Sequence, residues 1–173
     1  FIEDHDKQEL FRKYDKDSLS YYNERSLADL RSSAFSTNVF DSTLALLKEN
    51  ADVFVNKNSY SVTTKTTLPP SGDIHDYWHP APYAWPNPDT PDGLPYIHKD
   101  GQRVPGTRMY EDESIKYDRT SLQRLFDETT TLALAGYIFS NDNYLETAYR
   151  HIKAWFIAPE TAMNPNFNFA QVV

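Results

Sequence analysis

The chain has 173 residues, of which 39% are hydrophobic and 24% are charged, and its formal net charge is -8. This size fits one domain or part of a larger one, and the balance of 25 acids against 17 bases argues against a nucleic-acid-binding protein. No run approaches the roughly 18 consecutive apolar residues of a membrane helix, and the lack of cysteine excludes disulfide scaffolds, Cys-ligated zinc, iron–sulfur clusters and thiol nucleophiles.

The first third of the sequence predicts a polar arm followed by two helices. Residues 1–25 interleave acids, bases and tyrosines, and we expect an irregular or partly helical arm that starts at a processed N-terminus or an artificial boundary. Ser26 can cap a helix over residues 27–35, and a second helix is predicted over residues 39–55. The second helix carries one apolar stripe, formed by Phe40, Leu44, Leu47, Ala51 and Phe54. The β-branched residues 59–67 predict an extended connector or one short strand.

Residues 69–105 predict a long loop that packs against the rest of the protein. Nine of the 11 prolines fall here, and each removes an amide donor and restricts the residue before it. The loop also carries large aromatic side chains that a flexible linker lacks: Tyr77, Trp78, Tyr83, Trp85 and Tyr96. We therefore expect an ordered lid over a cleft, with Trp85 at least partly buried and Tyr77 facing the cleft.

The last third predicts two helices, over residues 120–139 and 143–157, that pack antiparallel. Apolar residues recur at steps of three and four in both segments, and Asn141 or Asp142 can cap the second. Because only Ser-Asn-Asp joins them, the helices must form a hairpin. The sequence then ends on the aromatic stretch NPNFNFAQVV, so we expect further helical pairs, as in a toroid, to cover it.

The densest chemistry lies in residues 71–108, which hold three histidines, five acids and five large aromatics. A divalent ion could be held by His75, Asp76 and His79, but the prolines that follow make the helical geometry of such ligands insecure. A carbohydrate site accounts for more of the residues, because sugar rings stack on Trp and Tyr while their polar groups take hydrogen bonds. Composition leaves open the alternative that the aromatics only attach the loop to the helices.

Three strings, SGDIHDYW, APYAWPNPDTPDGLPYIHKDG and AWFIAPETAMNPNFNFAQ, resemble signature segments of the alginate lyase-like polysaccharide lyase family. The resemblance runs in order along the whole chain. It implies an all-α fold, an α/α toroid or incomplete barrel of helical hairpins, with residues 1–173 as its N-terminal portion and residues 69–105 as its lid. It further implies a secreted, extracellular protein that cleaves a uronic-acid polysaccharide, such as alginate or glucuronan, by β-elimination.

β-Elimination needs a group that neutralises the C5 carboxylate, a base that removes the neighbouring proton and an acid that protonates the departing O4. In the resembled family an Asn-His pair and a Tyr do most of this, and the pair lies beyond the MNPxxNxAQ segment. This sequence contains no Asn-His dipeptide. We therefore assign no catalytic residue and expect a C-terminal polypeptide to complete the fold, unless the sequence is a shortened piece or a form that has lost catalysis.

The resemblance implies that the chain supplies the lid and one wall of a uronate-binding cleft. The residues expected there are His75, Tyr77, Tyr83, Trp85 and Arg108 from the loop, with Asn168 and Gln171 from the end of the chain. Arg108 is the candidate partner of a carboxylate. However, residues 71–108 hold five acids against three Lys or Arg, a poor field for a polyanion unless the histidines are protonated or the remainder of the protein is basic. We expect no metal or cofactor.

A second hypothesis is a non-catalytic glycan-binding or assembly protein that keeps the cleft wall. A helical scaffold of the tetratricopeptide kind is disfavoured because no 34-residue period is present. His5, in the polar arm, receives no role. His151 lies beside Ile152 on a predicted helix, and we expect its side chain to be partly exposed.

Overall fold

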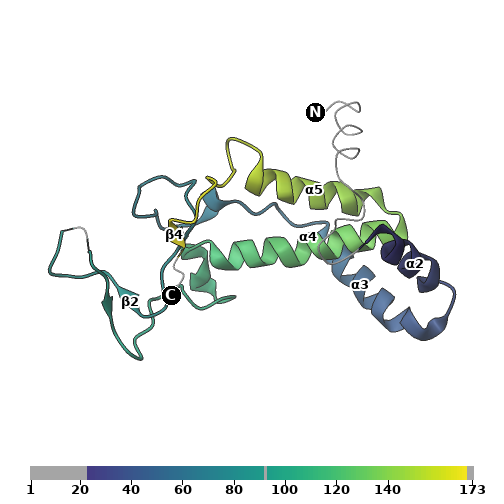
Figure 1. The fold of residues 1–173 in the computed structure, drawn as a ribbon, viewed down its shortest axis with the longest axis horizontal. Helices are drawn as coiled ribbons and strands as arrows, with labels where there is room; N and C mark the ends of the chain where they lie inside the picture. The colour runs from purple at the N-terminus through teal and green to yellow at the C-terminus, as the bar shows by residue number, and fades with distance from the viewer. Residues whose placement is uncertain (1–22, 92, 171–173) are drawn as a thin grey trace. The chain divides into compact units, whose positions relative to one another are not determined.

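The computed structural model describes residues 23–91 and 93–170, which are rich in helix and contain only very short strands (Figure 1). The chain divides into two compact units, Phe1–Glu49 and Asn50–Val173. The predictions for His5 and for most of the N-terminal arm lie outside the described residues. Within the described part of the chain, no helix is long and apolar enough to cross a membrane.

The first unit contains helix α2, Glu24–Ala34, and most of α3, Asp41–Phe54. Both predicted helices are confirmed, but the predicted cap of α2 is wrong. Asn23, in extended conformation, is the N-cap, and its side-chain oxygen accepts a hydrogen bond from the amide of Ser26 at 2.7 Å. Asparagine is a strongly preferred N-cap, so α2 begins earlier than the serine suggested. A 3-10 turn, Asn38–Phe40, leads into α3.

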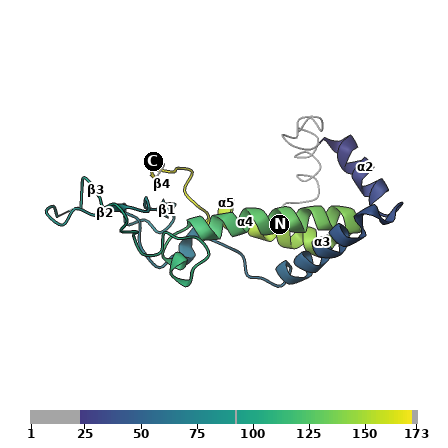
Figure 2. The same cartoon turned by 90° about the horizontal axis from the view of Figure 1, so that it is seen from below.

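Helices α4, Arg119–Phe139, and α5, Asp142–Phe156, lie side by side in the second unit and confirm the predicted antiparallel pair (Figures 1 and 2). Ser140 ends α4 in the left-handed region, at φ 53°. Asn141 caps α5 by accepting a hydrogen bond from the Asn143 amide at 3.1 Å. Close to the turn that joins the two helices, a Cβ added to Gly136 would lie 2.5 Å from Cδ2 of Leu145. Glycine at position 136 therefore allows α5 to approach α4 closely.

The core of the second unit forms where α4, α5 and the preceding loop meet. Its buried cluster consists of Val62, Tyr77, Leu125 and Trp155. His151 is fully buried, so the expected partial exposure of its side chain is wrong. Residues 144, 148, 151 and 155 follow steps of four, three and four, so His151 shares the buried face of α5 with Trp155.

Extended and irregular chain connects α3 to α4. Residues 59–67 form neither a strand nor a fully extended connector, because a 3-10 turn, Val62–Thr64, interrupts them. The loop that follows contains three strands of two residues each: β1, Trp78–His79, β2, Ala84–Trp85, and β3, Ile97–His98. β1 pairs in parallel with β4, Phe169–Ala170, and β2 pairs antiparallel with β3.

A buried ion pair fixes the loop to the start of α4. The Lys65 Nζ lies 2.9 Å from the Asp118 Oδ2, and both side chains are almost completely buried. Lys65 also donates to the carbonyl oxygens of Val62 and Ile74 at 2.7 Å, and the Trp78 amide donates to Asp118 at 2.8 Å. These bonds satisfy the groups that burial removes from water. Desolvation raises the pKa of Asp118 to about 6, against the opposing effect of Lys65.

Candidate functional site

Two of the three signature segments contact each other through one carboxylate. Oδ1 of Asp76 accepts hydrogen bonds from the side-chain amides of Asn164 at 2.8 Å and Asn166 at 3.1 Å, while its Oδ2 accepts one from the Ser71 hydroxyl at 2.7 Å. The bond from Asn164 is the main reason that the pKa of Asp76 lies below its ordinary value. We call these four residues the motif junction.

His75 lies beside the motif junction, and its ring orientation is set by the backbone. Its Nδ1 lies 2.7 Å from the carbonyl oxygen of Ala162. Since a carbonyl oxygen only accepts, Nδ1 carries the proton in this contact. The backbone oxygen of His75 also accepts a hydrogen bond from the backbone amide of Asn164 at 2.9 Å. This arrangement assigns Nε2 as the nitrogen that a ligand would meet.

Tyr77 does not face a cleft, which corrects the prediction for this residue. Its side chain is only 7% exposed and belongs to the core cluster with Leu125 and Trp155. Its ring also meets the ring of Phe167 edge-on, with centroids 5.4 Å apart. The ring is buried because β1 pairs with β4, with Trp78 opposite Phe169, and this pairing brings Phe167 against Tyr77. Burial raises the pKa of Tyr77 to about 12.

Tyr83 and Trp85 lie apart from the junction, on the β2–β3 hairpin. Trp85 is partly buried, as predicted, and its Nε1 donates to the carbonyl oxygen of Gln102 at 2.7 Å. A cation lies over each ring: the Lys99 Nζ is 5.3 Å from the ring centroid of Trp85, and the guanidinium carbon of Arg103 is 5.2 Å from that of Tyr83. The sequence analysis did not place either cation in the site. It could have grouped the two rings, because residues 83 and 85 stand two apart, as neighbours on one strand face do.

The remaining candidate residues are found in different places. The side chain of Arg108 is 66% exposed and pairs with Glu111 at 3.3 Å, so its ion pair links it to neither His75 nor the hairpin. Asn168 is exposed and its amide donates to Oδ1 of Asn166, which places it next to the motif junction. Gln171 lies outside the described residues.

The metal hypothesis finds no support in the arrangement of its ligands. Asp76 is occupied by the asparagines of the motif junction, and the ring of His79 meets the ring of Tyr117 edge-on at 5.9 Å. Burial lowers the pKa of His79 to about 4. Within residues 23–91 and 93–170, no three His, Asp or Glu side chains are grouped so that they could hold a metal ion.

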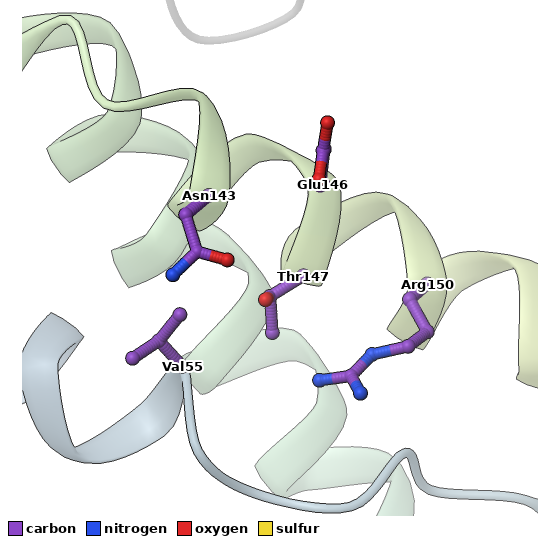
Figure 3. A pocket seen from close by; sticks show the side chains of 5 residues that line it. All are labelled: Val55, Asn143, Glu146, Thr147 and Arg150. Atoms are coloured by element: carbon purple, nitrogen blue, oxygen red, sulfur yellow. The ribbon is translucent and has the colours of Figure 1, made fainter.

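A hollow of about 360 Å³ lies elsewhere in the second unit, between the residue that follows α3 and one face of α5 (Figure 3). It is lined by Val55, Asn143, Glu146, Thr147 and Arg150. The Arg150 side chain also donates to the carbonyl oxygen of Lys57 at 3.3 Å. None of the candidate residues lines this hollow, so we do not place the site there.

Comparison with known proteins agrees with the geometry of the two signature segments. The model of the alginate lyase family matches residues 61–173, which include the motif junction and the hairpin. No curated protein matches the chain.

Among solved structures, an alginate lyase from Bacteroides ovatus is similar, with 36% sequence identity and a TM-score of 0.68. The match covers 87% of this chain and 38% of that protein, so the chain spans less than half the length of this relative. Both comparisons lead to the same conclusion: the chain belongs to the alginate lyase family.

Proposed function

We propose that the protein to which this chain belongs is a polysaccharide lyase that cleaves a uronic-acid polymer, alginate or glucuronan, by β-elimination. The observation that carries the proposal is the family match over residues 61–173, within which Asp76 joins two signature segments into one structure. Because its substrate is a large polymer, we also propose that the protein is secreted and acts outside the cell.

In this proposal the chain supplies part of the wall that holds the polymer. Tyr83 and Trp85 offer ring faces to the apolar faces of the sugars. His75, through Nε2, and Asn168 offer hydrogen bonds to hydroxyl or carboxylate oxygens, and Gln171 belongs to the same set. Arg108 would pair with a carboxylate after releasing Glu111. Positioning supplies much of the rate of such a reaction, so a wall without base and acid binds but does not cleave.

We further propose that the catalytic Asn-His pair and the missing wall come from a C-terminal polypeptide, which completes an α/α toroid. Support comes from α5, where an apolar stripe beside the buried face remains 40% to 46% exposed. The stripe is formed by Leu145, Tyr149, Ile152 and Phe156. Steps of four, three and four put these residues on one face, next to the buried face that contains Trp155. The apolar sector of α5 is thus wide enough for two neighbouring helices, as in a stack of helical pairs.

The alternative of a glycan-binding or assembly protein without catalysis draws on one observation, the lack of an Asn-His dipeptide in the 173 residues. Both hypotheses use the same wall, so they differ only in turnover.

The test follows the 4,5-unsaturated product by its absorbance, with alginate and glucuronan as substrates. We expect the intact protein to release this product and the 173-residue chain alone to release none. Product from the isolated chain would show that the base and acid are among these residues. Binding without any product from the intact protein would favour the non-catalytic alternative.

A further inference from the structure

We propose that the β2–β3 hairpin selects uronate polymers over neutral ones, with Lys99 and Arg103 pairing with sugar carboxylates beside the rings of Trp85 and Tyr83. We call these four residues the cation–aromatic face. The inference rests on the proposed function, because it names how the wall proposed above would recognise its polymer.

The strand register puts the two rings and Lys99 on one side of the hairpin. Ala84 pairs with His98, and Trp85 pairs with Ile97. The Lys99 amide donates to the carbonyl oxygen of Tyr83 at 3.0 Å, which extends the ladder by one residue. Directly opposed residues share a face, and so do residues two apart, so Lys99 is the diagonal neighbour of Trp85. Two rings separated by two strand residues, roughly 7 Å, offer successive platforms along an extended polymer.

The rings and cations hold each other in place. The Nε1 of Trp85 is bound to the Gln102 carbonyl oxygen, which fixes the plane of the indole. The Arg103 side chain lies over the ring of Tyr83 and approaches its hydroxyl oxygen at 3.4 Å. Such cation–π contacts orient the charge without neutralising it. A ligand carboxylate can therefore meet cations that are already positioned.

The charges of the cation–aromatic face have no acidic partner among the described residues. Lys99 and Arg103 are both half-buried, yet no carboxylate of residues 23–91 or 93–170 lies within 4.0 Å of either cation. The nearby acid Asp100 is paired with Nδ1 of His98 at 3.1 Å. The ring of His98 meets the ring of Tyr83 edge-on, with centroids 6.1 Å apart, so this pair borders the cation–aromatic face at Tyr83. The acid closest in sequence to Lys99 is therefore paired with a histidine, and neither cation of the face is its partner.

This arrangement fits a polymer that alternates sugar rings with carboxylates. A neutral polymer would gain the ring contacts only, whereas a uronate polymer would gain both ring contacts and charge-assisted hydrogen bonds. We therefore expect two separate contributions to affinity. The rings should bind charged and neutral polymers alike, and the cations should add affinity for charged polymers only.

The experiment measures binding to the intact protein by isothermal calorimetry at low salt. The ligands are alginate and glucuronan oligomers from exhaustive digestion, which the protein no longer shortens, and the same oligomers with their carboxylates reduced to neutral hydroxymethyl groups. The variants are Trp85→Leu and the double substitution Lys99→Gln with Arg103→Gln, which removes both positive charges and keeps a polar side chain at each position. Lys153→Gln, an exposed cation on α5, is the matched control.

We expect the double substitution to weaken uronate binding at least tenfold and to leave the affinity for the neutral oligomers within twofold. Trp85→Leu should weaken both, and Lys153→Gln neither. Added salt should lower the wild-type affinity for uronates and have little effect on the double variant. Unchanged uronate affinity in the double variant, or an equal loss for charged and neutral oligomers, would overturn the inference. Product release is measured separately. If the intact protein cleaves uronate polymers while the double variant keeps the wild-type preference for charged oligomers, this inference is refuted and the proposed function stands.

Discussion

One carboxylate, that of Asp76, accepts the three side-chain hydrogen bonds that join the residues of the motif junction. The effect of replacing Asp76 on stability can therefore be estimated. Asp76→Ala would remove the acceptor of the Asn166 side-chain amide and of the Ser71 hydroxyl, and one of the two acceptors of the Asn164 side-chain amide. A hydrogen bond to a charged group contributes about 1.5–3 kcal/mol. Ser71 is exposed and both asparagines are half-buried, so water replaces part of the three lost bonds. We therefore expect Asp76→Ala to lower the free energy of unfolding by about 2–4 kcal/mol.

Two comparisons make this prediction specific. Asp76→Asn keeps an oxygen for both asparagine amides, so we expect a loss of only about 1 kcal/mol. Asp73→Asn alters an exposed acceptor of Asn164, 3.0 Å away, and should have a smaller effect than Asp76→Ala. The lowered pKa of Asp76 means that its contribution is present above the unfolded-state pKa and is lost as the pH falls through the folded-state pKa. Asp76→Asn should therefore remove part of the acid sensitivity.

Urea unfolding gives the free energies, and amide hydrogen exchange reports on residues 162–170. We expect faster exchange in that segment in Asp76→Ala while the amides of α4 keep their protection. An unchanged urea midpoint together with unchanged exchange at residues 162–170 would refute the reasoning, because it would mean that Asp76 does not join the two segments.

Two further predictions concern the second unit. Gly136→Ala should cost about 1–2 kcal/mol, because overpacking against Leu145 outweighs the roughly 1 kcal/mol gain in helix propensity. Adding Leu145→Ala should make the double variant more stable than additive losses predict, and strict additivity in urea unfolding would contradict the contact. Burial lowers the pKa of His79 to about 4, from about 6.5 in the unfolded chain, so the neutral side chain favours the folded state. We therefore expect the free energy of unfolding to fall by up to about 2 kcal/mol between pH 7 and pH 4.5. His79→Phe should flatten this decline relative to wild type, and parallel pH curves would argue against it.

The helices could be predicted from the sequence because their determinants are local. Steps of three and four residues predict the positions of α4 and α5. Asn141 is one of the two caps that the sequence offered for α5, because a cap acts within three residues. The same locality explains the error at Ser26, where two polar residues competed to cap α2 and only the backbone conformation of Asn23 decides between them. The density of proline likewise predicted a loop with little regular structure.

The site depended on contacts between residues that are distant in the sequence. Asp76 and Asn164 are 88 positions apart, and nothing local marks their hydrogen bond. The burial of Tyr77 and His151 follows from which face each element turns to the core, which the helical period alone leaves open when a helix such as α5 has apolar residues over a wide sector. Lys99 meets Trp85 only through the register of the hairpin. Composition supplied the aromatic and charged residues, but long-range pairing determined which of them face one another.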